Sequence, residues 1–247
     1  MTDGYDLRDV SVTYGSRAVL AGIDLHIGAA ACVAVLGPNG AGKSTLLRVL
    51  TGHAPERRGA VALDGIPLEE YSRETLARRV AVVPGEASLP FAARVEEVVA
   101  LGRIPHEDPF RGMRDADHAA VAAAIERVGI ADLVGRDARR LSLGERQLVV
   151  LAMALAQAPR VLILDEPTVH LDLRHQVEVM ELLLELNARD GVGVIAVLHD
   201  LSLAAHFFTR LILLDGGRLV ADGAPDEVLS DERIRAVYGV DPALVRR

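Results

Sequence analysis

Cysteine, lysine and long apolar runs are scarce in this 247-residue sequence. The only cysteine, Cys32, lies in an apolar segment, so we expect a buried small hydrophobe and no disulfide scaffold. The longest apolar run, Leu148 to Ala156, has nine residues, and about 18 are needed to cross a bilayer. The first six residues have neither a positive region nor an apolar core. We therefore expect no membrane span and no secretory signal.

Acidic residues outnumber basic ones. The sequence has 35 Asp and Glu against 27 Lys and Arg, a formal net charge of -8, and it has no basic tail or cluster. This balance argues against duplex nucleic acid as the main partner. Half of the residues are apolar and a quarter are charged, which are ordinary proportions for a globular protein that buries a sizeable core.

Short apolar runs alternate with helical patterns, which predicts an α/β fold with a mostly parallel, buried sheet. The runs expected as its strands are Cys32–Leu36, Val80–Val83, Val161–Leu164 and Val192–Leu198. Residues 7–28 and 60–65 are expected to form a flanking antiparallel β-layer. Near the end, residues 211–214 and 218–221 are typical of a hairpin.

The strand signal disappears between residues 86 and 140. Two helical segments, Val95–Leu101 and Asp115–Val128, are expected there, separated by a loop from Pro105 to Gly112. We therefore expect one domain over residues 1–247, with a core of residues 1–84 and 158–247 and an inserted helical subdomain at about 86–157.

A phosphate-binding pattern, G-x-x-x-x-G-K-[ST], follows the first of these strands. It reads Gly37, Pro38, Asn39, Gly40, Ala41, Gly42, Lys43, Ser44 and Thr45. Glycines let successive N–H groups turn toward phosphate oxygens, Lys43 can reach the β- and γ-phosphates, and the Ser44 hydroxyl can bind Mg²⁺. The alternative is a glycine-rich turn, but the only lysine of the sequence lies where a compact ammonium is required.

Polar residues follow two of the other predicted strands. Asp165 and Glu166 come directly after Val161–Leu164, where Asp165 is placed to hold Mg²⁺ and Glu166 to polarise an attacking water. The alternative is an acidic turn before Pro167. His199 follows Val192–Leu198 and is a candidate contact of the γ-phosphate, or else a helix cap or a core histidine.

A helix reaching about Gln157 begins after Ser142, and Ser142 with Glu145 forms a capping box. The same uncrowded helix N-terminus, with a free hydroxyl and a glycine amide, can also bind a phosphate from a second subunit. Spacing alone leaves both roles open.

With these motifs in this order, the whole sequence resembles the nucleotide-binding subunit of an ABC transporter. Residues 37–45 resemble Walker A, Val161–Glu166 resembles Walker B, and Leu141–Glu145 matches the signature LSGGE at four of five places. The resemblance implies a P-loop NTPase core, ATP and Mg²⁺ as cofactors, and ATP hydrolysis with Glu166 as the catalytic glutamate. Asp165 and Ser44 are the implied Mg²⁺ ligands.

The resemblance also implies roles for residues outside the phosphate loop. It implies that Tyr14 stacks on adenine, that Asp172 belongs to the D-loop and that His199 is the switch histidine. Ser142, Leu143, Gly144 and Glu145 then complete the ATP site of an opposite subunit. The implied partners are a second copy or a homologous ATPase in a head-to-tail dimer, permease subunits at the cytoplasmic face of the membrane, and indirectly a substrate-binding protein.

The sequence departs from the family at two positions. Leu143 replaces a common glycine of the signature. Gly85 and Glu86 stand where the family has a glutamine that touches Mg²⁺ and water. Either Glu86 substitutes after a shift of one residue, or catalysis is slower and coupling altered, or the residue was changed deliberately. If the contact is lost, Gly85→Gln is expected to raise turnover.

The stretches 98–106 and 165–176 resemble ATPases of importers for iron-siderophores, haem and cobalamin. The alternatives are a soluble ABC ATPase acting on DNA or ribosomes, and a nucleotide-binding regulatory module that hardly hydrolyses ATP. The helical lobe, residues 86–140, is expected to dock on the permease, with Arg103 and Arg111 as exposed contacts. His106, His170 and His175 are not expected to bind a metal.

Overall fold

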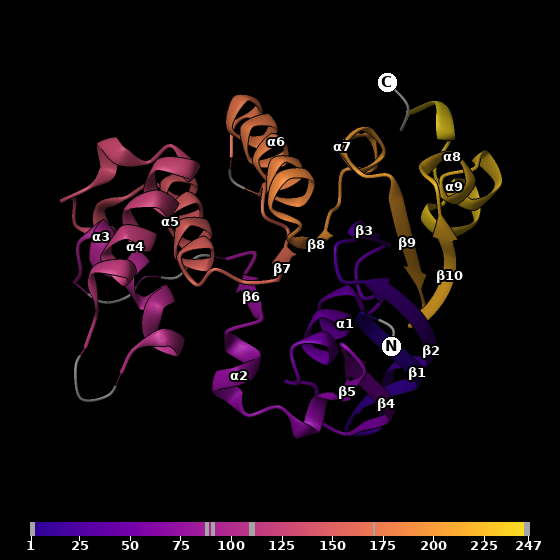
Figure 1. The fold of residues 1–247 in the computed structure, drawn as a ribbon. Coiled ribbons are helices and arrows are strands. Elements are labelled where there is room, and N and C mark those ends of the chain that lie inside the picture. Colours follow the sequence, from indigo (N-terminus) through magenta and orange to yellow (C-terminus); the bar gives the residue numbers. More distant parts are fainter. Residues whose placement is uncertain (1–2, 87–88, 90–91, 109–111, 170, 245–247) are drawn as a thin grey trace. The chain divides into compact units, whose positions relative to one another are not determined.

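The computed structural model describes residues 3–86, 89, 92–108, 112–169 and 171–244. The chain divides into two compact units (Figure 1). The first consists of Met1–Tyr71 with Gly193–Arg247, and the second of Ser72–Val192. None of the helices in these ranges is long and apolar enough to cross a membrane.

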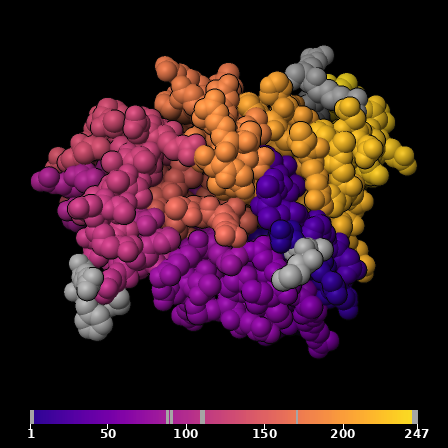
Figure 2. Space-filling model, viewed as in Figure 1, coloured from indigo at the N-terminus to yellow at the C-terminus, as the bar shows by residue number. Residues whose placement is uncertain are grey.

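The first unit contains the antiparallel layer that the sequence predicts. Its strands are β1 (Gly4–Tyr14), β2 (Arg17–Gly28), β4 (Arg57–Leu63) and β5 (Ile66–Pro67), in the order β2-β1-β4-β5. The turn at Gly15 and Ser16 joins β1 to β2, with Tyr14 opposite Arg17. A 3-10 turn, η1 (Leu68–Glu70), follows β5. In Figure 2 the residues of this layer are among those coloured indigo to purple.

The first unit also contains a mostly parallel set of strands. These are β3 (Cys32–Leu36), β8 (Gly193–Val197), β9 (Arg210–Asp215) and β10 (Arg218–Gly223), in the order β10-β9-β3-β8. The strand β3 is parallel to both of its neighbours, and β9 and β10 form the predicted hairpin. Its helices are α1 (Lys43–Leu50), α7 (Leu201–Phe207), α8 (Pro225–Val228) and α9 (Asp231–Tyr238), followed by η5 (Pro242–Leu244).

The second unit contains a parallel pair of strands, β6 (Val80–Val83) and β7 (Val161–Asp165). Its helices are α2 (Arg73–Ala77), α3 (Val95–Ala100), α4 (Asp115–Val128), α5 (Leu143–Ala156) and α6 (Leu173–Asp190), with 3-10 turns η2 (Leu101–His106), η3 (Ala131–Leu133) and η4 (Ala138–Arg140). The helices α3, α4 and α5 pack against one another (Figure 1). The predicted strands and the helices of the inserted lobe are therefore confirmed.

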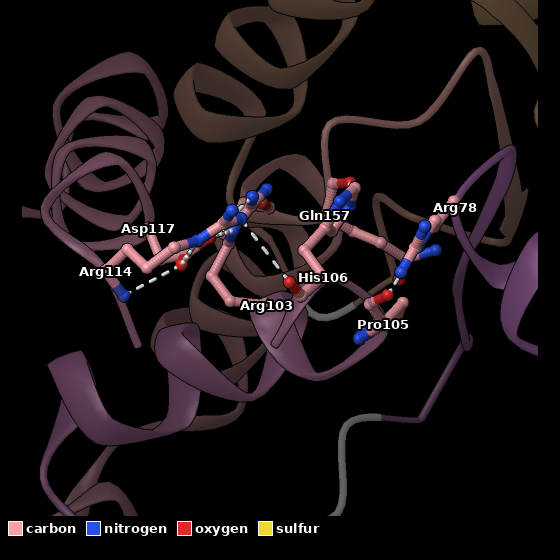
Figure 3. Close-up of polar contacts among 8 residues, drawn as sticks. Arg78, Arg103, Pro105, His106, Arg114, Asp117 and Gln157 are labelled. Atoms are coloured by element: carbon pink, nitrogen blue, oxygen red, sulfur yellow. Dashed lines mark hydrogen bonds and ion pairs between the residues drawn. The ribbon is translucent and has the colours of Figure 1, made fainter. Parts of the chain in front are cut away.

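A buried ion pair holds this helical lobe together (Figure 3). Nε and Nη2 of Arg103, in η2, donate to Oδ1 of Asp117 in α4 at 3.0 and 2.8 Å, and Nη1 donates to the carbonyl of Ala156 at 2.7 Å. Asp117 is 0% exposed and Arg103 is 7% exposed. The expectation that Arg103 is a surface contact is therefore wrong, because its guanidinium is used inside the lobe. Arg111 lies outside the described residues.

Neighbouring contacts extend this network (Figure 3). Nε of Arg78 donates to the carbonyl of Pro105 at 2.6 Å, and a ring nitrogen of His106 lies 2.8 Å from the carbonyl of Gln157. The backbone N–H of Arg114 donates to Asp117. This bond and the Arg103 guanidinium hold the pKa of Asp117 well below its usual range. The 3-10 turn η2 is thus fixed to α4 and to the end of α5.

We predict that Asp117→Asn lowers the melting temperature by about 10 °C, because it leaves the buried Arg103 without a counter-charge. Because the pKa of Asp117 is depressed in the folded state, the ionised carboxylate stabilises the fold fully above the ordinary aspartate pKa of about 3.9. This contribution to the free energy of unfolding is lost as the pH falls below that value. The difference in melting temperature between wild type and Asp117→Asn, measured by calorimetry, should therefore narrow below about pH 4. The exposed Asp132→Asn serves as the control, and a gap that stays constant down to about pH 3 would contradict the role of the charge.

Candidate functional site

The phosphate loop connects β3 to α1 in the first unit. Gly37 and Gly42 have positive φ angles of 146° and 103°, which side-chain-bearing residues rarely adopt. A Cβ at Gly37 would collide with the carbonyl oxygen of Leu214, and one at Gly42 would lie 2.6 Å from the Leu20 side chain. Glycine is therefore required at both positions for the loop to follow this course.

The lysine of the loop is folded back over it. Lys43 is 7% exposed, and its ammonium donates to the carbonyl oxygens of Gly37 and Pro38 at 2.7 and 3.1 Å. These contacts hold a positive charge inside the loop at the N-terminus of α1, which has no acidic side chain in its first turn. A helix N-terminus and an ammonium at the same place favour an anionic ligand such as a phosphate chain. Ser44, beside Lys43, is exposed, whereas Thr45 is buried.

Tyr14 lies at the end of β1 and contacts the helix that follows the phosphate loop. Its hydroxyl accepts a hydrogen bond from Nη1 of Arg48 at 3.1 Å, and this bond lowers the pKa of Tyr14. The ring is half-buried, so part of its surface is accessible to a ligand. Sequence reasoning did not identify Arg48, because nothing in the pattern of α1 indicates a partner on β1.

His199 leaves the sheet beside the phosphate loop. The parallel strands β8 and β3 pair Val197 with Val35, and the N–H of Leu198 donates to the carbonyl of Val35. The two parallel strands therefore end at the same edge of the sheet. His199 follows β8 and Gly37 follows β3, each two residues after the Val197–Val35 pair. The imidazole is exposed, and Asp200, not His199, caps α7. The predicted alternatives of a helix cap and a core histidine are thus excluded.

Asp165 and Glu166 lie at the end of β7, in the second unit. Both are half-buried, and the next two residues, Pro167 and Thr168, are buried. Glu166 has a φ of 54°, the left-handed region that few residues other than glycine adopt. The carbonyl of Glu166 accepts a hydrogen bond from the N–H of Val169 at 3.1 Å, which closes a tight turn. Strain of this kind concentrates at functional sites.

Gly85 lies next to this turn. A Cβ at Gly85 would lie 2.8 Å from the carbonyl oxygen of Asp165, which is closer than real Cβ contacts. Glu86, the next residue, is exposed. The increase in turnover expected of Gly85→Gln therefore disagrees with the packing here, because any side chain at this position meets the main chain of Asp165.

The signature residues form the N-terminus of α5. Ser142 Oγ accepts from the N–H of Glu145 at 3.2 Å, and a carboxylate oxygen of Glu145 accepts from the N–H of Ser142 at 2.7 Å. The predicted capping box is therefore present, and the bond from the Ser142 N–H lowers the pKa of Glu145. Leu143 is 51% exposed and Gly144 is half-buried, so this terminus remains accessible to a second molecule.

Asp172 and His175 form a similar cap on α6. Oδ1 of Asp172 lies 2.9 Å from the N–H of His175 and 2.8 Å from its Nδ1, and the N–H bond lowers the pKa of Asp172. Both side chains are exposed. His106 is engaged with Gln157, and His170 lies outside the described residues. The described residues contain no cluster of His, Cys, Asp or Glu that fits a metal ion.

Each unit therefore carries a separate part of the predicted machinery. The first holds Tyr14, the phosphate loop and His199, and the second holds Gly85, the signature residues, the carboxylates after β7 and Asp172. The sequence profile of the family described as ABC transporter matches residues 20–169, more than half of the chain. The chain belongs to the ABC transporter family. As a member of this family, it is an ATPase.

Relatives of this ABC ATPase are named for import or transport. The hemin import ATP-binding protein HmuV of Streptomyces coelicolor is 47% identical over 227 residues, which are 92% of this chain and 80% of the relative. FepC of Escherichia coli, a ferric enterobactin transport ATP-binding protein, is 40% identical over 233 residues, 94% of this chain and 86% of the relative. The cobalamin import ATP-binding protein BtuD of Halobacterium salinarum is 41% identical over 244 residues, 96% of this chain and 61% of the relative.

Solved structures show the same fold. The dimeric ATP-binding cassette MJ0796, in a post-hydrolysis state bound to ADP and Pi, matches with a TM-score of 0.79 at 27% identity. The match covers 90% of this chain and 98% of that one. The predicted P-loop NTPase fold, with a mostly parallel sheet and an antiparallel sheet, is therefore confirmed.

One contact of this ABC ATPase was missed by sequence reasoning. The hydroxyl of Tyr238, in α9, is buried beside the backbone N–H of Gly37, and burial raises the pKa of Tyr238 to about 12. The C-terminal helix thus packs against the first residue of the phosphate loop. The sequence carries no signal for this, because Tyr238 and Gly37 lie almost a whole chain apart. Cys32, expected to be buried, is only half-buried, and desolvation raises its pKa to about 11, which is typical of an unreactive thiol.

Proposed function

We propose that this ABC ATPase powers a membrane importer whose cargo is an iron-siderophore, haem or cobalamin. The observation that carries the proposal is the identity of 40–47% to relatives named for import or transport of these compounds, over nearly the whole chain. The same names favour an importer over an ATPase that acts on DNA or ribosomes. The phosphate loop and the carboxylates after β7 supply the chemistry that such a subunit needs.

The nucleotide is held by the first unit in this proposal. Tyr14 offers a half-buried ring to adenine, and the loop amides with Lys43 bind the β- and γ-phosphates. The Ser44 hydroxyl and the Asp165 carboxylate are hard oxygen donors of the kind that Mg²⁺ prefers, so the residues present fit this ion. When bound, Mg²⁺ neutralises charge that develops on the phosphates.

Hydrolysis follows from the roles of Glu166 and His199. Glu166 accepts a proton from a water whose oxygen forms a bond to the γ-phosphorus, while the bond from that phosphorus to the bridging oxygen of ADP breaks. His199 holds the γ-phosphate during this step. The products are ADP and phosphate, and the proton leaves Glu166 afterwards.

We further propose that the complete site requires a second ATPase subunit in head-to-tail orientation. Ser142 and Gly144 lie at an accessible helix N-terminus, which favours a phosphate of the opposite subunit. Leu143 is 51% exposed, so its side chain is not packed over this helix N-terminus. The dimer acts on permease subunits at the cytoplasmic face of the membrane, which receive cargo from a substrate-binding protein.

Glu166→Gln is expected to bind ATP and to lose most of its turnover, because it keeps the shape of the side chain and removes the base. An ATP-held dimer should then persist in size-exclusion chromatography. Lys43→Ala should instead weaken ATP binding by at least about tenfold, equal to about 1.4 kcal/mol. Glu178→Gln, at an exposed acid of α6, is the matched control. Unchanged phosphate release by Glu166→Gln would remove this residue as the base.

The permease is expected to dock on the helical lobe through η2, because Ile104 is 59% exposed and Leu101 is 40% exposed there. Ile104→Asp should weaken co-purification of the permease at least about tenfold and leave basal ATP hydrolysis nearly intact. Val220→Asp, at a 42% exposed apolar residue of β10, is the control. Equal loss of the permease with both variants would argue against a dock at η2.

The cargo is tested by reconstituting the ATPase with its permease and binding protein in proteoliposomes. Ferric siderophore, haem and cobalamin are compared with a sugar and an amino acid as uptake substrates. We expect ATP-dependent uptake of one of the three metal chelates. Transport of only the sugar or the amino acid would exclude the cargo class and leave the ATPase assignment intact.

A further inference from the structure

The loop after β6 packs directly on the turn that carries Glu166. The parallel strands β6 and β7 pair Val83 with Leu164, so Gly85 and Glu166 occupy matching positions two residues beyond this pair. A Cβ at Gly85 would lie 2.8 Å from the carbonyl oxygen of Asp165 and 3.6 Å from Cβ of Glu166. The closer of these neighbours is main chain, which cannot rotate aside as a flexible side chain can.

The loop around Gly85 is also held from the other side. The side chain of Gln147, in α5, is 3% exposed and donates through Nε2 to the carbonyl of Pro84 at 3.0 Å. This bond restrains the residue before Gly85, so a side chain at Gly85 cannot be accommodated by moving the loop without losing the hydrogen bond of the buried Gln147 side chain. Displacement of Asp165 and Glu166 is the other way to make room.

The turn that would be displaced is already in an unfavourable backbone conformation. Glu166 has a φ of 54°, a left-handed conformation that is unfavourable for any residue with a Cβ. Contacts with the surrounding residues must therefore hold Glu166 in this conformation. The Gly85 contact is on the strand side of this turn, and the bond from the Val169 N–H to the Glu166 carbonyl closes the other side. The direction of the Glu166 side chain therefore depends on residue 85 being a glycine, which leaves space for the turn.

We propose that Gly85 is a positioning residue for Glu166. Main-chain contact between Gly85 and Asp165 holds the left-handed turn that directs the Glu166 carboxylate. The inference rests on the proposed role of Glu166 as the base. It gives the glycine a function of its own, so the glutamine usual in the family would disturb this site instead of restoring it.

The test compares Gly85→Ala and Gly85→Gln in the full chain, with Gly28→Ala as the control because an added Cβ at Gly28 meets no atom within 4 Å. Turnover at saturating ATP is expected to fall at least about tenfold in both Gly85 variants. The dissociation constant for ATP should stay within about twofold of wild type, because the phosphate loop is not altered. Turnover at or above the wild-type value in either variant would overturn the proposal.

Hydrogen exchange separates this inference from the role of Glu166. In Gly85→Ala, faster amide exchange is expected in the peptide covering residues 163–169, and Gly28→Ala should leave this peptide unchanged. Lower turnover with unaltered exchange would overturn the positioning role. If Glu166→Gln keeps full turnover, the proposed base is wrong, whereas faster exchange in Gly85→Ala would still support the packing contact. Gly85→Ala adds the smaller group and carries the test if Gly85→Gln does not fold.

Discussion

Main chain packed directly on main chain, with no space for a Cβ, is the constraint on which the machinery of this ATPase depends. Gly37 packs on the carbonyl of Leu214 at the start of the phosphate loop, and Gly85 packs on the carbonyl of Asp165 beside the carboxylates. At both places the ends of neighbouring strands determine the course of the backbone. The reactive groups are therefore positioned by the sheet, and side chains such as Lys43 and Glu166 only extend from a backbone that is already fixed.

Buried charge is handled differently in the two units. In the first unit the ammonium of Lys43 donates to the carbonyl oxygens of Gly37 and Pro38, inside the phosphate loop at the N-terminus of α1. In the second unit the guanidinium of Arg103 is paired with the Asp117 carboxylate, and its remaining nitrogen donates to the carbonyl of Ala156. An ion pair satisfied in this way fixes the lobe and attracts no ligand. The two buried cations thus differ in their setting: Lys43 lies in a loop at a helix N-terminus, which favours an anionic ligand, whereas Arg103 joins elements of the helical lobe.

The elements that the sequence predicts are those specified by local patterns. The buried strands β3, β6, β7 and β8 follow from continuous apolar runs, and the phosphate loop and the capping box at Ser142 follow from spacing within a few residues. The burial of Arg103 could not be predicted, because its partner Asp117 lies beyond a loop and η2 has no amphipathic period. The left-handed Glu166 and the close approach of Gly85 also depend on pairing between segments far apart in the sequence. A family pattern describes which side chain is usual and not how much space this backbone leaves, so the expectation for Gly85→Gln disagrees with the packing at Gly85.

The absent glutamine still leaves a connection between the signature helix and the carboxylates. Gln147 lies on α5, in the turn that follows Ser142–Glu145, and its hydrogen bond reaches Pro84, the residue before Gly85. Gly85 in turn packs on the carbonyl of Asp165, next to Glu166. A shift of α5 relative to β6 therefore acts on the same contact that sets the left-handed turn. One part-buried hydrogen bond and one close main-chain approach therefore connect the signature helix to the turn that carries Glu166.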